Sequence, residues 1–128
     1  MPSLDTDCLL RWLLDDIPAQ TARVDALLAV HPRLTVPDVA LIEVVFVLER
    51  VMKLPRESIA TALGGLAAEN TFAFDRAFWA AVIELYLVHP KLSVADVYLA
   101  LDARRTGTDP LLTLDQKLAH QLDGVEPV

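Results

Sequence analysis

The sequence has one cysteine, four glycines and few basic residues, and these scarcities bear on the classes of protein to which it can belong. Cys8 alone cannot form an internal disulfide, which fits a reducing cytoplasm. No apolar run reaches the roughly 18 residues of a membrane span, because Glu43, Glu49 and Glu84 interrupt the longest ones. No basic segment followed by an apolar stretch marks a signal peptide. We therefore expect a soluble cytoplasmic protein that does not insert into a membrane.

The shortage of basic residues leaves a net charge of −7, from 11 lysines and arginines against 18 acids. A nucleic-acid-binding surface is normally basic, so this charge alone argues against one. Two arrangements would still permit nucleic-acid binding by an acidic chain. Bound divalent cations would offset clustered carboxylates, and an acidic surface would suit a basic protein partner. Acidity that simply keeps an apolar-rich chain soluble explains the same charge, so charge does not decide the function.

Several catalytic and binding motifs are also missing. His31 and His89 lie in His-Pro turns and His120 stands apart, so we predict no zinc site. The pair at 64 and 65 is the only Gly-Gly, and no Lys-Ser or Lys-Thr follows it, which excludes a phosphate-binding loop. No serine or cysteine has the local partners of an activated nucleophile.

The chain is rich in apolar residues, at 54%, and they recur with helical spacing between prolines and glycines. With 128 residues it is large enough for one domain, residues 1–128, whose core needs no disulfide or metal. One helix should begin near Cys8, and further helices are predicted over residues 19–30, 37–53, 56–69, 74–88, 94–105 and 115–122. Short strands are predicted over residues 2–5, 34–36, 71–73, 111–114 and 125–128. Alternating short strands and helices predict an α/β fold with a mainly parallel sheet.

Residues 30–39 and 88–97 have nearly the same sequence. Each is predicted to end one helix, turn at His-Pro and cap the next helix with a hydroxyl, from Thr35 or Ser93. An aspartate follows three residues later, as in a capping box: Asp38 in one segment and Asp96 in the other. Capping, which stabilises a helix by about 1 kcal/mol, accounts for both aspartates without any chemistry.

Glu43 lies in an apolar helix, between Val39 and Leu48, and we predict that it is buried. A buried carboxylate costs several kcal/mol unless it is paired or binds a metal. A groove-facing or ion-paired glutamate is the structural alternative. Glu84 stands in the same situation, so the residues alone do not separate the two.

Asp5 and Asp115 each follow a short predicted strand, where open α/β sheets place their ligands. The alternative is that each caps the helix that follows, and near Asp5 this role could equally fall to Thr6 or Asp7. Repeated strand-then-acid patterns nevertheless raise the expectation of a site. Acids without histidine or cysteine suit Mg²⁺ or Mn²⁺, which take oxygen ligands.

With these residues placed, the chain resembles the PIN-domain family, in particular toxin ribonucleases of the virulence-associated-protein C type. The resemblance covers most of the chain and rests on four short motifs in order: Leu4-Asp5-Thr6-Asp7, Leu41-Ile42-Glu43, Val94-Ala95-Asp96 and Leu114-Asp115. The family usually has Asn where this chain has Asp7, which could add a ligand charge. The family fold is a three-layer α/β/α sandwich around a short parallel sheet, in agreement with the element pattern.

The resemblance implies that Asp5, Glu43, Asp96 and Asp115 are catalytic acids that hold one or two Mg²⁺ or Mn²⁺ ions, supported by Thr6. It implies metal-dependent hydrolysis of RNA, and it favours Glu43 over Glu84 and Asp96 over Asp38. It also implies a homodimer, inhibited by a small antitoxin with a basic tail. The basic residues considered for guiding RNA are Arg11, Lys53, Arg104, Arg105 and Lys117.

Two other functions remain open at this level. Asp5-Thr6-Asp7 fits the opening motif of haloacid-dehalogenase-type phosphatases, but no lysine occurs in a matching motif. A catalytically silent PIN-like module that only dimerises or binds an antitoxin would need no metal, and metal affinity would distinguish it.

Overall fold

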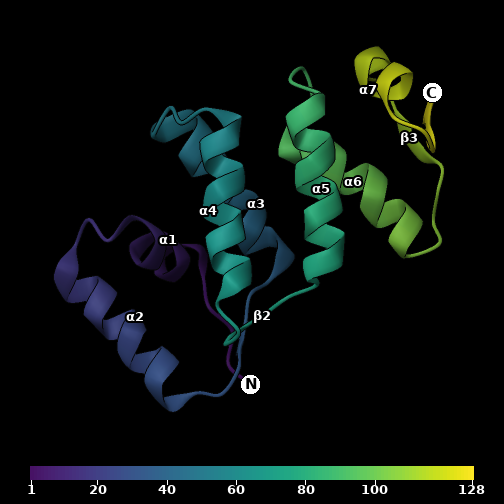
Figure 1. Cartoon of the computed structure of the whole chain (residues 1–128). Coiled ribbons are helices and arrows are strands. Elements are labelled where there is room, and N and C mark those ends of the chain that lie inside the picture. Colours follow the sequence, from purple (N-terminus) through teal and green to yellow (C-terminus); the bar gives the residue numbers. More distant parts are fainter. The chain divides into compact units, whose positions relative to one another are not determined.

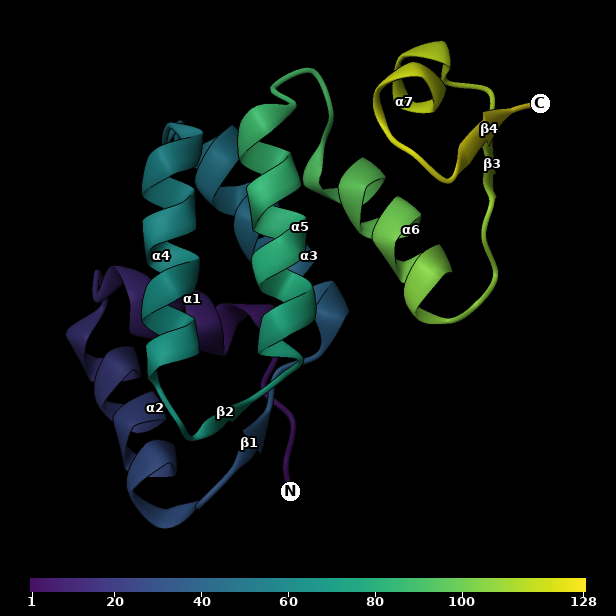
Figure 2. The ribbon, with the colours of Figure 1, turned by 45° about the vertical axis from the view of Figure 1, so that its right-hand side comes forward.

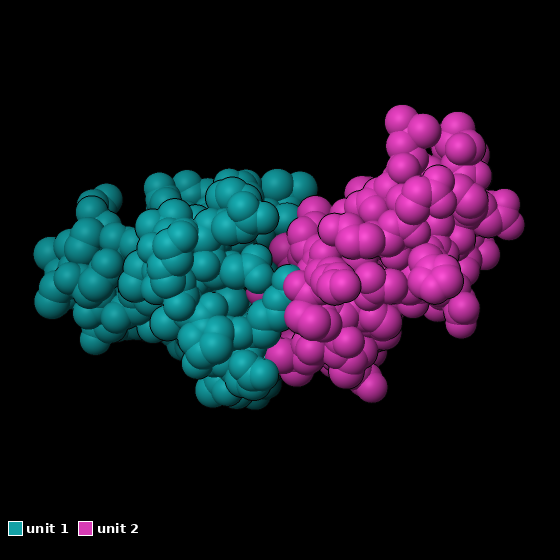
Figure 3. Space-filling model, turned by 90° about the horizontal axis from the view of Figure 1, so that it is seen from above, with its two compact units in different colours: residues 1–76 teal, residues 77–128 magenta.

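The computed structural model describes residues 1–128, which divide into two compact units, residues 1–76 and 77–128 (Figures 1 and 3). The helices and strands of unit 1 are α1 (Thr6–Leu14), α2 (Pro18–Val30), β1 (Leu34–Thr35), α3 (Asp38–Phe46), the π-helix η1 (Val47–Val51), α4 (Arg56–Ala68) and β2 (Phe72–Ala73). Those of unit 2 are α5 (Arg76–Val88, whose first residue belongs to unit 1), α6 (Val94–Arg105), β3 (Leu111–Thr113), α7 (Gln116–Gln121) and β4 (Val125–Pro127).

All the predicted helices are present, and the predicted α/β class is confirmed: helices predominate, with short parallel strands between them. The helix predicted over residues 37–53 is α3 continued by η1. The strands form two two-stranded parallel sheets, β1–β2 in unit 1 and β3–β4 in unit 2. The strand predicted over residues 2–5 is reduced to one parallel bridge between Ser3 and Thr35. No helix combines the length and apolar character needed to cross a bilayer.

In unit 1 the N-terminal segment runs beside β1, and this pairing positions Asp5 (Figure 2). The backbone N–H of Leu4 donates to the Thr35 carbonyl at 2.9 Å, and the Thr35 N–H donates to the Pro2 carbonyl at 2.7 Å. Leu4 is buried, so its burial fixes the register of this segment. Asp5 therefore lies where the extended backbone ends and α1 begins.

Helices α1 and α2 lie side by side in unit 1 (Figures 1 and 2). The Thr21 hydroxyl donates to the Arg11 carbonyl at 2.9 Å, which ties the two helices together. The helical spacing of residues 19–30 predicts that Ala22, Ala26, Leu27 and Val30 share one apolar side, but α2 buries Thr21 and Val24 instead.

The two His-Pro segments differ in structure, and the prediction that Thr35 caps a helix is wrong. Thr35 is a β1 residue, and α3 begins at Asp38 with Pro37 at its N-cap. In unit 2 the expected capping box is present. The Asp96 N–H donates to Ser93 Oγ at 3.1 Å, and the Ser93 N–H donates to Asp96 Oδ2 at 3.0 Å.

Candidate metal site and the neighbouring pocket of unit 1

Two of the four predicted acids share one hollow in unit 1. Asp5 and Glu43 both line a cavity of about 350 Å³, together with Thr6. Asp5 comes from the end of the N-terminal segment and Glu43 from the middle of α3. The residues around this hollow therefore include two carboxylates, Asp5 and Glu43, and two hydroxyls, Ser3 and Thr6, and Glu43 is distant in the sequence from the other three.

The prediction that Glu43 is buried is wrong, because its side chain is exposed. Helix α3 buries Ala40, Leu41, Val44 and Val45 on one face. Glu43 lies on the other face, with Val39 at 64% exposed and Phe46 at 53% exposed. An apolar sequence on all sides of a helix does not bury every residue when only one face meets the core. Glu84 on α5 is exposed as well, so desolvation does not mark either glutamate as functional.

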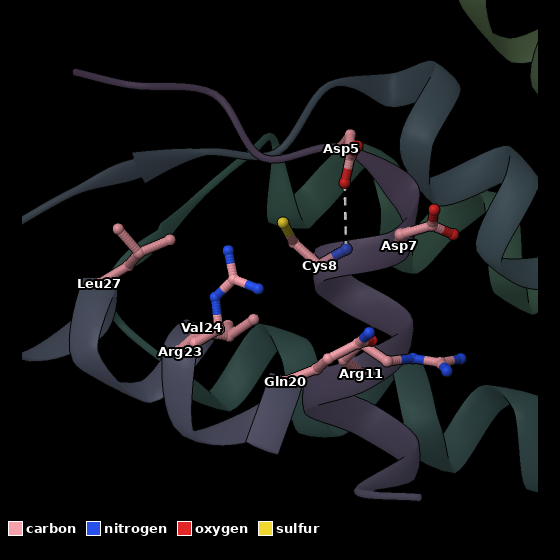
Figure 4. Close-up of a pocket in the computed structure, with 8 residues that line it drawn as sticks. All are labelled: Asp5, Asp7, Cys8, Arg11, Gln20, Arg23, Val24 and Leu27. Atoms are coloured by element: carbon pink, nitrogen blue, oxygen red, sulfur yellow. Dashed lines mark hydrogen bonds between the residues drawn. The ribbon is translucent and has the colours of Figure 1, made fainter. Parts of the chain in front are cut away.

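Asp5 caps α1, as the structural alternative supposed. Its Oδ1 accepts a hydrogen bond from the Cys8 N–H at 3.1 Å (Figure 4). A cap uses only one carboxylate oxygen. The side chain is exposed and forms no ion pair, so the second oxygen is available to another ligand.

Asp5 also lines a second hollow of about 350 Å³ between α1 and α2, which we call the Arg23 pocket (Figure 4). Its walls include Asp5, Asp7, Cys8 and Arg11 on the α1 side, and Gln20, Arg23 and Leu27 on α2. Asp7, the residue that departs from the family pattern, lines this pocket and is not among the residues around Glu43. Asp5 is the one residue that lines both hollows.

The surroundings of Cys8 favour its protonated thiol over the thiolate. Burial raises the pKa of Cys8 above its ordinary value, and hydrogen bonding to the Asp5 side chain and the negative charge of that side chain raise it further. Because the thiolate is the reactive form, this environment makes Cys8 a weak nucleophile near neutral pH. The expectation that no cysteine acts as a nucleophile agrees with its surroundings.

The other two predicted acids, Asp96 and Asp115, belong to unit 2 and both serve as helix-capping residues there. Asp96 forms the capping box with Ser93 at the start of α6. Asp115 is the N-cap of α7, and its Oδ1 accepts from the Leu118 N–H at 3.2 Å. Both side chains are half-buried, and each retains an oxygen beyond the one that caps.

The residues of unit 1 fit a hard divalent cation held by few protein ligands. No group of three or more histidine, cysteine, aspartate or glutamate side chains is gathered to hold a metal. Asp5 and Glu43 line one hollow, and neither carboxylate forms an ion pair with a lysine or arginine side chain. Mg²⁺ is usually bound by one or two carboxylates plus waters and substrate phosphates. Two carboxylates beside Thr6 meet that requirement, with Asp5 and Glu43 as the residues that would hold the ion.

Most of the arginines and lysines considered for RNA binding are engaged elsewhere. Arg11 pairs with Asp16 at 3.4 Å, and Arg105 pairs with Asp102 at 2.7 Å. Arg104 donates to the carbonyl of Asp123, and Lys117 donates to the carbonyl of Lys91. Each of these cationic groups is therefore bonded to a residue of its own unit.

The sequence-based selection missed Arg23, which lines the pocket beside Asp5 and forms no ion pair. A signal for it exists in the sequence. Gln20, Arg23 and Leu27 follow the spacing i, i+3 and i+7, which places them on one face of a helix. That this face lines a pocket together with residues of α1 is a property of the tertiary structure.

Comparison with known proteins gives one match. The sequence model of the PIN domain matches residues 3–122. The matched range extends over both units and includes Asp5, Glu43, Asp96 and Asp115. No curated protein matches the chain, and no solved structure does.

Proposed function

Because the chain belongs to the PIN-domain family, we propose that it is a Mg²⁺- or Mn²⁺-dependent endoribonuclease. PIN domains are typically metal-dependent nucleases that act on RNA or other nucleic acids. The observation that carries the proposal is the hollow shared by Asp5, Glu43 and Thr6 within this family match. A phosphatase of the haloacid-dehalogenase type has no support from the comparison.

The chemistry proposed for these side chains is hydrolysis of an RNA phosphodiester bond. When bound, the cation supplies positive charge beside the phosphate and acidity to a nearby water. Asp5 and Glu43 would hold the cation, and Asp5 is itself oriented by the Cys8 N–H. The hydroxyl of Thr6 supplies a further oxygen beside the two carboxylates.

The test is cleavage of total cellular RNA by the purified protein with Mg²⁺, with Mn²⁺ and with EDTA. We expect cleavage with metal, none with EDTA, and a loss of about 100-fold or more in Asp5→Asn and Glu43→Gln. Asparagine still caps a helix, so the first variant should remain folded. Glu84→Gln is the matched control, since Glu84 is also an exposed helical glutamate. Cleavage retained in Asp5→Asn at unchanged metal concentration contradicts the proposal.

The resemblance adds Asp96 and Asp115 of unit 2 to the same set of acids, and we propose that units 1 and 2 form one PIN domain, residues 1–128. The support is that the family match extends over both units. Calorimetric titration of Mn²⁺ into Asp96→Asn and Asp115→Asn measures whether they contribute to the affinity. Unchanged Mn²⁺ affinity and unchanged cleavage would assign them to capping alone.

The biological setting in this proposal is a cytoplasmic toxin that a small antitoxin with a basic tail inhibits, and that forms a homodimer. The net charge of −7 suits a basic inhibitor. Exposed apolar side chains on α3 and η1, among them Val39, Phe46 and Val51, are surface that a second copy would cover. Light scattering at micromolar concentration tests the dimer, and a monomeric mass contradicts it.

One observation favours a second function, a catalytically silent module that binds a partner. Asp5, Asp96 and Asp115 each cap a helix, so each has a structural role without any metal. Such a module would bind no Mn²⁺ and cut no RNA while remaining folded.

A further inference from the structure

The pocket between α1 and α2 combines features of a binding site for a phosphate group. It is bounded by Asp5, a residue of the candidate metal site, and by Arg23 of α2 (Figure 4). Gln20 adds a polar side chain to its wall, and Leu27 adds an apolar one. Guanidinium groups bind phosphates through paired, charge-assisted hydrogen bonds.

Arg23 is the cation in this pocket that is free to bind a ligand. Figure 4 shows the guanidinium of Arg23 projecting from α2 toward Cys8 and Asp5. The guanidinium of Arg11 points away from that of Arg23. Arg11 is held by Asp16 at 3.4 Å. Arg23 forms no ion pair although carboxylates line the same pocket, so all of its donors remain available.

The local charges make this site depend on the neighbouring cation. Asp5 and Asp7 line the pocket and would repel a phosphate when their charges are not offset. A divalent ion held by Asp5 removes much of that repulsion, and Mg²⁺ commonly shares its coordination with substrate phosphates. One residue, Asp5, lines both the metal hollow and the Arg23 pocket, so the two ligands would be adjacent.

We propose that the Arg23 pocket binds a backbone phosphate of the RNA substrate beside the scissile one, with Arg23 as the positioning residue. This inference rests on the proposed nuclease function and names the contact that orients its substrate. It explains how a chain of net charge −7 presents a cation to RNA next to its acids. A phosphate contact of this kind positions the strand without reading its sequence.

The experiment measures RNA binding without cleavage. Anisotropy of a labelled, short single-stranded RNA is recorded in Ca²⁺, a cation that takes the same oxygen ligands, over a range of NaCl concentrations, and a gel checks that the RNA stays intact. Arg23→Gln should lower the affinity about tenfold. It should also reduce the slope of log affinity against log salt by about 0.7, the value for one phosphate on a single strand.

Three comparisons sharpen the test. Arg33→Gln removes the same charge from an exposed position of unit 1 that lines neither hollow, and should change both quantities much less. Arg23→Lys should keep the salt slope yet lose part of the affinity, because lysine cannot form the paired contact. RNA should slow alkylation of Cys8, the only cysteine and a wall of the pocket, at a pH above neutral.

Equal binding and equal salt slopes in Arg23→Gln and Arg33→Gln would overturn the inference, even if metal-dependent cleavage is lost in Asp5→Asn as proposed. Protection of Cys8 by a lysine-rich peptide but not by RNA would assign the pocket to a basic protein segment and would also overturn it. If the protein neither binds RNA in Ca²⁺ nor cleaves RNA with Mg²⁺ or Mn²⁺, the nuclease proposal fails first.

Discussion

Residues 30–39 of unit 1 and residues 88–97 of unit 2 differ at three positions, Arg33 against Lys91, Thr35 against Ser93, and Pro37 against Ala95. The first segment nevertheless forms strand β1 before α3, and the second passes from a turn directly into α6. Thr35 is hydrogen-bonded through its backbone to Pro2, whereas Ser93 caps α6 with its side chain. Similar sequences therefore gave different helix starts.

The difference at Pro37 explains the two outcomes. The ring of a proline disfavours the helical conformation for the residue before it. Val36 therefore stays extended, and its N–H donates to the Ala73 carbonyl at 2.9 Å. Val94 precedes Ala95, meets no such restriction and becomes the first residue of α6. The residue at this position, Pro37 or Ala95, thus decides whether the preceding hydroxyl, of Thr35 or Ser93, can cap a helix.

The largest expected effect concerns the two aspartates of these segments. Under the nuclease proposal, Asp96→Asn should lower metal-dependent RNA cleavage about 100-fold or more, while Asp38→Asn should leave it nearly unchanged. Asparagine keeps a side-chain oxygen that can accept from the Ser93 N–H, so a large loss of cleavage in a folded Asp96→Asn variant reports a role beyond the capping box. Equal activities in the two variants would reduce Asp96 to a structural residue.

A smaller effect is expected when the proline of the first segment is introduced at the corresponding position of the second. Ala95→Pro should restrict Val94, disrupt the capping box and lower the free energy of unfolding by about 2 kcal/mol. Urea denaturation measures the change. The reverse change, Pro37→Ala, should cost less than about 1 kcal/mol, chiefly through the greater freedom of the unfolded chain. If Ala95→Pro is harmless, the proline does not explain the difference between the segments.

The smallest effect should separate the two hydroxyls. Ser93→Ala removes an observed cap and should lower the free energy of unfolding by about 1 kcal/mol. Thr35→Ala should cost only a few tenths of a kcal/mol, since Thr35 is bonded through its backbone. Thermal denaturation followed by circular dichroism compares them. Equal losses would mean that the hydroxyl of Thr35 has a structural role after all.

Local patterns in the sequence predicted the elements well. The helix predicted over residues 94–105 is Val94–Arg105 in the structure, and the caps expected at Asp5, Asp96 and Asp115 are present. Each of these features depends on a few neighbouring residues, which the sequence displays directly. The pairing of Asp5 with Glu43 in one hollow was expected only from the family resemblance, since nothing local joins residues so far apart.

Long-range packing decided what local patterns could not. One failed prediction concerns a helix face: Glu43 was expected to be buried and is exposed. Thr35 was expected at a helix cap and lies in a strand, because Pro37 keeps Val36 extended and β1 pairs with β2. In an apolar helix such as α3, the sequence contains no contrast that tells which side meets the core. The partners supply that information, because burial depends on which elements pack together.

By itself, the sequence determined the helices, the caps, the parallel α/β class and the family, because these follow from local conformational preference and from short motifs. Only the tertiary structure decided that Asp5 lines one hollow with Glu43 and another with Arg23. The physical reason is that α1 meets α3 and α2 through contacts between residues distant along the chain. Their backbone pairing and side-chain packing select one arrangement among many that local preference would allow.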